Sequence, residues 1–124
     1  MIEVPRSEVL AEEMLAEAYE LVLSGWCQGA AALDEAGRPI EPSSAFARRW
    51  SISGALARVW RRGPMDGTAL EAFQRANLAL SAAVRGVPQE WNDAEERTLA
   101  QALDALAEAV QRLAEVEELE SSLS

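Results

Sequence analysis

Four tryptophans are the most distinctive residues of the chain, because four is a large number for 124 residues. They are Trp26, Trp50, Trp60 and Trp91. A buried indole ring adds a large apolar area to a core, and its N–H then needs a hydrogen-bond acceptor. The same ring also suits a pocket that recognises a peptide or a small ligand. We expect the tryptophans to seal the core in irregular segments, with a tryptophan-lined pocket as the alternative.

The tripeptide Trp91-Asn92-Asp93 is the sharpest local motif. Asparagine and aspartate side chains just before a helix often accept the free N–H groups of its first turn. We therefore expect Asn92 or Asp93 to cap the last helix. Asp93 could equally reach back to Arg97 or to the loop after Trp26. A binding role for its carboxylate is the alternative to these structural roles.

The chain contains no histidine, and all of its basic residues are arginine. This excludes Ser-His-Asp and Cys-His catalysis and every imidazole metal ligand. A single cysteine cannot build a zinc site, and no glycine-rich phosphate loop or dinucleotide fingerprint is present. Metal-independent carboxylate chemistry stays open, but nearly all of the 21 acidic residues fall on stretches predicted to face solvent. We expect no catalytic residue, no metal and no cofactor.

Cys27 is the only cysteine, so an internal disulfide cannot form, and this agrees with a reducing compartment. It follows a predicted helix, whose negative dipole end would raise the thiol pKa. We expect a small buried hydrophobic residue rather than a reactive thiol. No apolar run approaches the roughly 20 residues that span a bilayer, and the acidic N-terminus lacks the layout of a signal peptide. We therefore expect a cytoplasmic protein without a membrane segment.

The net charge of −10 is unevenly distributed. Both ends of the chain are acidic, whereas residues 25–63 carry a net charge of +3. The overall negative charge disfavours direct binding to nucleic acid or to an anionic membrane. The arginines of the middle segment are candidates for gripping a phosphate, but we expect them to pair with the acidic first and last helices. The residues concerned are Arg48, Arg49, Arg58, Arg61 and Arg62.

Apolar spacing predicts a first helix over residues 5–23, with Pro5 in its first turn and Gly25 as a left-handed cap. A last helix is predicted to begin between residues 93 and 98 and to run to about residue 119, with a frayed tail over 120–124. Thr98 and Gln101 match a capping box near its start. A third helix is predicted over residues 69–85.

In that third helix, Thr68 and Glu71 also match a capping box. A second helical region is predicted over residues 45–62, capped by Ser43 or Ser44. Phe46 is assigned to the apolar surface of this region.

Trp50-Ser51 is the alternative start of this second helix, with Ser51 as its cap. Gly54 within it predicts the close approach of another backbone. Residues 26–44 read as an ordered loop or a small hairpin, with a turn from Asp34 to Pro39. The fold class is therefore all-α, a compact bundle of about four helices in a single domain over residues 1–124. The loop or hairpin lies between its first two helices.

These features resemble DUF6197, a family of proteins from actinobacteria and their phages that has no assigned activity. The resemblance rests on Gly25 to Gly29, the Asp34 to Pro39 turn, Trp50 through Leu56, and Trp91 to Asp93 followed by Arg97-Thr98, and covers residues 8–114. It implies that a group of residues matters to the family, for folding or for binding. These residues are Trp26, Gly54, Ala55, Trp91, Asn92, Asp93, Arg97 and Thr98.

The leading functional hypothesis is a non-enzymatic protein-interaction module, and a phage-encoded inhibitor of a host (defence) complex is its specific form. The alternative is a ligand-binding protein or enzyme with a pocket between Trp26, Trp50 and Trp91. In that pocket Asp93 or Arg49 would be the polar anchor. A third hypothesis is a homodimer formed through the last helix. The candidate residues for a ligand or partner are Trp26, Gln28, Arg49, Trp50, Trp91, Asn92 and Asp93.

Overall fold

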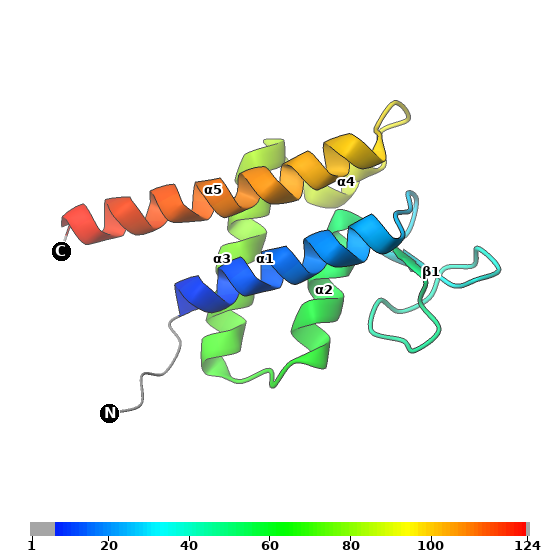
Figure 1. The fold of residues 1–124 in the computed structure, drawn as a ribbon, viewed down its shortest axis with the longest axis horizontal. Helices are drawn as coiled ribbons and strands as arrows, with labels where there is room; N and C mark the ends of the chain where they lie inside the picture. The colour runs from blue at the N-terminus through cyan, green and yellow to red at the C-terminus, as the bar shows by residue number, and fades with distance from the viewer. Residues whose placement is uncertain (1–6, 124) are drawn as a thin grey trace.

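The computed structural model describes residues 7–123, with side chains described for residues 7 and 9–115. In this part of the chain, five helices and two very short strands follow in the order α1, β1, β2, α2, α3, α4 and α5 (Figure 1). The helices are α1 (Ser7–Ser24), α2 (Ile52–Arg62), α3 (Gly67–Val84), α4 (Pro88–Asn92) and α5 (Leu99–Leu123). The strands are β1 (Ala32–Leu33) and β2 (Arg49–Trp50). The all-α prediction is confirmed, and Pro5 lies outside the described residues.

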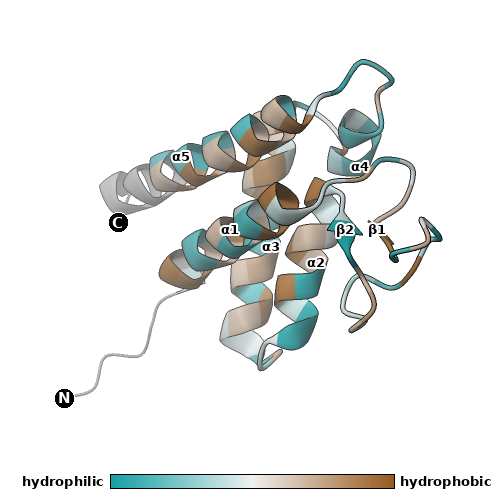
Figure 2. Ribbon diagram, turned by 45° about the vertical axis from the view of Figure 1, so that its right-hand side comes forward, coloured by the Kyte–Doolittle hydropathy of each residue, from teal (hydrophilic) through white to brown (hydrophobic). Residues whose placement is uncertain are grey.

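Helices α1 and α5 lie side by side, and α3 crosses behind both of them (Figures 1 and 2). Helix α2 packs on α1 and α3. The apolar stripe of α5 faces α1 and α3. The core where these helices meet is rich in alanine, which lets their backbones approach closely, and its largest fully buried apolar side chains are Leu15, Ile52, Leu56, Leu80, Leu106 and Leu113. No described helix combines the length and the apolar character needed to cross a lipid bilayer.

The segment between α1 and α2 was predicted to be an ordered loop or a small hairpin, and it contains a small hairpin. β1 pairs antiparallel with β2, with Ala32 opposite Trp50. The predicted turn is confirmed, because the Asp34 carboxylate accepts the Arg38 N–H at 2.9 Å and its carbonyl accepts the Gly37 N–H at 3.0 Å. The second strand lies beyond residues 26–44, where the hairpin was expected.

The helix predicted over residues 45–62 begins only at Ile52, so the alternative break at Trp50-Ser51 is the correct one. The Ser51 Oγ accepts the Gly54 N–H as an N-cap, and neither Ser43 nor Ser44 serves in this role. Arg49 and Trp50 before it form a strand, because Trp50 exchanges backbone hydrogen bonds with the segment after α1. Tertiary pairing therefore overrides the local helical pattern.

Three predicted helix ends differ in detail. Asp66, not the Thr68–Glu71 pair, caps α3 by accepting the Ala69 N–H at 2.8 Å. Gly25 does not adopt a left-handed conformation. A glycine is needed at position 25 for a different reason: an added Cβ would lie 2.4 Å from the Arg48 carbonyl oxygen. Helix α5 continues to Leu123, beyond its predicted end.

The entrance to α5 corrects the expected role of the Trp-Asn-Asp motif. Neither Asn92 nor Asp93 caps α5, because α4 lies between Val87 and Asp93 and the motif belongs to its last turn. The Thr98–Gln101 capping box is confirmed, with reciprocal backbone-to-side-chain hydrogen bonds of 3.1 and 3.2 Å. The motif is consequently free to make contacts elsewhere.

Candidate functional site

Asn92 is the centre of a hydrogen-bond network that joins α4, the loop after α1 and the start of α2. The residue is fully buried. Its Oδ1 accepts hydrogen bonds from the Trp26 indole N–H at 2.8 Å and from the Ile52 backbone N–H at 3.2 Å. Its Nδ2 donates to the Cys27 carbonyl and to the Asp93 carboxylate, both at 3.0 Å. The amide therefore uses all of its donor and acceptor capacity.

The carboxylate of Asp93 connects the same loop to α4. It accepts the Gly29 backbone N–H at 2.9 Å, and Gln89 Nε2 donates to its two oxygens at 2.9 and 3.1 Å. Burial by itself would raise the pKa of Asp93, but the hydrogen bonds from Gly29, Asn92 and Gln89 lower it below its ordinary value. Asp93 thus reaches back to the loop after Trp26, as one of the alternatives predicted.

Gln28 and Ser51 extend the network on either side. Gln28 Nε2 donates to the carbonyls of Asn92 at 2.9 Å and Ala94 at 2.8 Å. Ser51 Oγ donates to Gln89 Oε1 at 2.8 Å. Ser51 and Asn92 are buried, whereas Gln28 and Asp93 are exposed. Breaking a hydrogen-bond network around buried polar groups is costly when all of them are satisfied. The network therefore locks the loop after α1 between α2 and α4.

Gly54 of α2 allows the loop before β1 to pack directly against this helix. A Cβ at this position would lie 1.8 Å from the carbonyl oxygen of Ala31, which is far too close for two non-bonded atoms. The predicted close approach of another backbone is confirmed, and the backbone that approaches is the loop immediately before β1.

The predicted site residues fall into two groups. Trp26, Gln28, Asn92 and Asp93 meet in the network, whereas Arg49, Trp50 and Trp91 lie outside it. Trp50 is only 5% exposed, and its indole N–H donates to the Pro42 carbonyl at 3.0 Å. A pocket shared by Trp26, Trp50 and Trp91 is therefore wrong, because Trp50 is part of the core. Trp60 also acts as a packing residue and stacks on Phe73 with ring centroids 5.2 Å apart.

Arginines of α2 brace the loop of residues 41–48, which we call the braced loop. Arg58 donates to the carbonyls of Pro42 at 2.8 Å and Ser44 at 2.9 Å, and its guanidinium lies 4.9 Å from the centroid of the Trp50 ring. Arg62 donates twice to the Ser43 carbonyl, at 3.1 and 3.2 Å.

Two other arginines act on the same loop. Arg61 forms an ion pair with Glu41, and Arg48 donates to the carbonyls of Ala45 and Ala47. The expected pairing with the first and last helices is therefore wrong for these four arginines, because Arg61 pairs with Glu41 and the other three donate to carbonyls of the loop.

Phe46 is presented to solvent by the braced loop, with 71% of the residue exposed. Its backbone N–H donates to the Ser44 Oγ at 3.1 Å, which helps to fix the turn. A groove of about 570 Å³ lies beside the ring, between Ile40, Arg38 and Arg48. The sequence placed Phe46 on the apolar face of a helix. The signal that could have revealed its exposure is the alternative start at Ser51, which leaves Phe46 in a loop.

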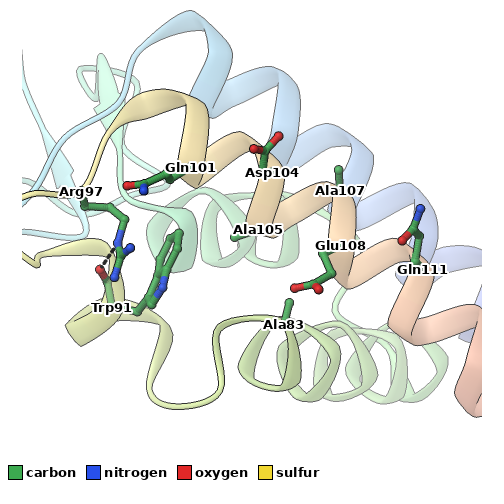
Figure 3. Close-up of a pocket in the computed structure, with 9 residues that line it drawn as sticks. All are labelled: Ala83, Trp91, Arg97, Gln101, Asp104, Ala105, Ala107, Glu108 and Gln111. Atoms are coloured by element: carbon green, nitrogen blue, oxygen red, sulfur yellow. Dashed lines mark hydrogen bonds between the residues drawn. The ribbon is translucent and has the colours of Figure 1, made fainter.

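A second groove, of about 500 Å³, lies along α5 (Figure 3). Trp91 and Arg97 form one end of it: the guanidinium carbon lies 3.8 Å from the ring centroid, and Arg97 Nε donates to the Trp91 carbonyl at 2.9 Å. Glu108 points from α5 toward Ala83 of α3 in Figure 3. The groove thus offers an aromatic face, one cation and acidic side chains.

Cys27 is 5% exposed, and its Sγ contacts the Ala30 carbonyl at 3.6 Å. Burial raises the pKa of the Cys27 thiol to about 11, although the charge of Arg49 acts in the opposite direction. The predicted direction of the shift and the burial are confirmed, but the main cause is desolvation and not the helix dipole. Among the described residues, no group of three or more cysteine and acidic side chains could hold a metal ion.

The described residues thus form a helical fold with a locked loop, a groove beside Phe46 and a groove along α5. The chain belongs to a family of unknown function (DUF6197), whose model matches residues 6–112. This confirms the resemblance inferred from the sequence. No curated protein and no solved structure matches the chain. Of the residues that the resemblance implicates, Trp26, Gly54, Asn92 and Asp93 hold the locked loop, and Thr98 caps α5.

Proposed function

We propose that this chain is a non-enzymatic protein-interaction module that docks through Phe46 on the braced loop. The observation that carries the proposal is a 71% exposed aromatic ring on a loop held by hydrogen bonds from several arginines. Isolated apolar side chains on a surface are ordinary, but the ordering of a loop around one of them is costly. An anchor that is already ordered loses less conformational entropy on binding, and aromatic anchors dominate many interfaces.

The cytoplasm is the proposed location, and the lone free thiol of Cys27 supports it. A more specific form, in which the acidic helices make a second contact besides Phe46, is a phage-encoded inhibitor of a host (defence) complex, and the strong net charge of −10 supports it. An inhibitor that presents its acidic helices to a basic groove should lose binding at high salt. Replacement of Glu13, Glu17 and Glu20 of α1 by glutamine would then abolish inhibition, whereas retained inhibition would exclude this form.

The experiment that tests the module is a comparison of F46S with L78S. Leu78 is a matched control because it is 72% exposed and lies on α3, away from the braced loop. Tagged wild-type and variant proteins are incubated with a lysate of the cells that carry the gene, and bound proteins are quantified by mass spectrometry. We expect F46S to lose at least one partner that both wild type and L78S retain. Equal recovery by all three proteins would refute docking through Phe46.

The α5 groove favours a second candidate function, the binding of a small ligand against Trp91. A ligand present at a hundred times its dissociation constant stabilises the folded state by roughly 2.7 kcal/mol. A thermal-shift screen of metabolites should then give a hit that is lost in W91A and kept in F46S. A broad screen without such a hit would remove this candidate.

A further inference from the structure

The groove along α5 combines an aromatic end with a small-residue lining and acidic side chains (Figure 3). Trp91 and Arg97 form one end of it. Ala83, Ala105 and Ala107 also line the groove, and their methyl groups leave a space of about 500 Å³. A space of this size is typical of pockets that hold a small ligand.

Trp91 can offer a ligand only part of its indole ring. One face is covered by the guanidinium of Arg97, whose carbon lies 3.8 Å from the ring centroid. The hydrogen bond from Arg97 Nε to the Trp91 carbonyl, of 2.9 Å, fixes this arrangement. In Figure 3 the ring stands between Arg97 and the part of the groove that Ala105 and Glu108 border. A ligand in the groove would therefore meet an aromatic surface, which favours stacked or edge-to-face contact with another ring.

The negative charge of the groove comes from Asp104 and Glu108, which lie four residues apart on one face of α5. Both residues are exposed. The carboxylate of Asp104 has no hydrogen bond or ion pair in the described part of the chain. Glu108 forms a long ion pair of 3.8 Å with Arg112 of the same helix, and such surface pairs are weak. Both carboxylates can therefore attract a cation from solution.

An anion is the competing occupant, because Arg97 also lines the groove. Two observations favour a cation. The groove contains two carboxylates and one guanidinium, so its own charge is negative. The guanidinium is already stacked on Trp91, and its Nε already donates to a carbonyl. The net charge of −10 acts in the same direction, because it draws cations toward the molecule.

We propose that the α5 groove binds a small organic cation that carries an aromatic ring, an arylalkyl amine. This inference rests on the second candidate function, the binding of a small ligand against Trp91, and adds the chemistry of the ligand. The ring of the amine packs against the indole of Trp91. Its ammonium group pairs with Glu108, which points across the groove toward α3, while Asp104 adds negative charge nearby (Figure 3).

The test uses phenethylamine as the probe, with phenylpropionate and butylamine as matched controls. Phenylpropionate has a carboxylate in place of the ammonium group, and butylamine lacks the aromatic ring. Each compound is titrated into the full chain at neutral pH. NMR follows the chemical shift of the Trp91 indole N–H, assigned with W91F, and gives the dissociation constant.

Two matched pairs of variants locate the bound amine. E108Q removes a charge from the groove, whereas E115Q removes the other carboxylate that pairs with Arg112, which does not line the groove. A107L fills the groove, whereas A114L adds the same side chain at another position of α5 that does not line it. All four positions are exposed, so the fold should tolerate these changes.

We expect phenethylamine to shift the Trp91 signal and to bind several-fold more tightly than either control compound. E108Q and A107L should each weaken this binding several-fold, whereas E115Q and A114L should leave it nearly unchanged. Phenylpropionate that binds as tightly as phenethylamine, and is lost in A107L, would overturn the inference while the small-ligand function survives.

Two further results would also overturn the inference. One is the absence of any shift with phenethylamine, and the other is binding that neither E108Q nor A107L weakens. The small-ligand function itself does not depend on these results, because it is refuted only if the broad metabolite screen gives no hit that W91A removes.

Discussion

At the scale of single residues, Asn92 has the largest structural role in the network. Its amide satisfies the Trp26 indole, the Ile52 N–H and the Cys27 carbonyl at once. These groups are then paired away from water, where an unpaired polar group costs about 1–3 kcal/mol. The motif that looked like a helix cap is consequently a tertiary clamp.

We predict that N92A lowers the free energy of unfolding by about 3 kcal/mol or more, because several buried groups lose their partner together. Urea denaturation followed by tryptophan fluorescence measures this change. Q74A, at an exposed amide of α3, is the control and should stay within about 0.5 kcal/mol of wild type. If N92A lowered the free energy of unfolding no more than Q74A does, the structural role assigned to Asn92 would be wrong.

Gly54 gives a second prediction at this scale. In G54A the new methyl group would overlap the Ala31 carbonyl, so the loop or α2 must move. We expect destabilisation of about 3 kcal/mol, at the upper end of typical overpacking costs. In G67A, at the start of α3, nothing lies within 4 Å of the new Cβ, and stability should be nearly unchanged. Circular dichroism measures the melting temperatures of the two variants. Equal melting temperatures would contradict the close approach of Ala31 to Gly54.

Cys27 makes stability depend on alkaline pH. Its thiol pKa is raised from 9.0 to about 11 in the folded protein, so the unfolded chain releases the proton first. The stabilisation is complete below pH 9.0 and is lost as pH rises from 9.0 through about 11. The free energy of unfolding of wild type should fall more steeply over this range than that of C27A. Identical slopes would show that the thiol is not desolvated in the folded state.

At the scale of elements, local sequence patterns predicted some ends of helices and turns correctly and others wrongly. The Thr98–Gln101 box and the Asp34 turn were predictable, because their hydrogen bonds join residues close in sequence. The start of α2 was not fixed by local pattern, since residues before Ser51 are held by distant backbone partners such as Gly25. Helix α4 escaped prediction because five residues carry too weak a periodicity.

The candidate site shows the same division between local and distant information. Trp26 and Asn92 were each conspicuous in the sequence, but their hydrogen bond spans 66 positions and could not be derived from spacing. Trp50 was assigned to the pocket alternative, although its burial depends on the fold around Pro42. Phe46 was missed because a helix starting at residue 45 would have hidden it.

At the scale of the whole molecule, acidic and basic residues are concentrated on different elements. Helices α1 and α5 lie side by side (Figure 2) and carry exposed acids, whereas residues 25–63 carry a net charge of +3. The exposed acids of these two helices include Glu13, Glu17, Glu20, Asp104, Glu108 and Glu115. Such a distribution can orient the molecule as it approaches a charged partner.

We predict that the purified protein is a monomer. The third hypothesis from the sequence, a homodimer through the last helix, requires a free apolar stripe on α5. The structure packs Leu106 and Leu113 of that stripe in the core, where α5 meets α1 and α3. Light scattering coupled to size exclusion should give the mass of one chain, 13.5 kDa. A mass twice as large would support the dimer instead.

The central claim is that the braced loop is ordered before any partner binds. Native-state hydrogen exchange of the free protein tests this most directly, with the Ala47 and Arg48 amides as reporters, because they donate to the carbonyls of Ser44 and Leu33. We predict clear protection of both in wild type. R58A should speed their exchange by about tenfold or more, because hydrogen bonds from a charged group are worth about 1.5–3 kcal/mol each. R112A, on α5, should leave the exchange rates of both amides unchanged. Exchange of both amides at the unprotected rate in wild type would contradict the account.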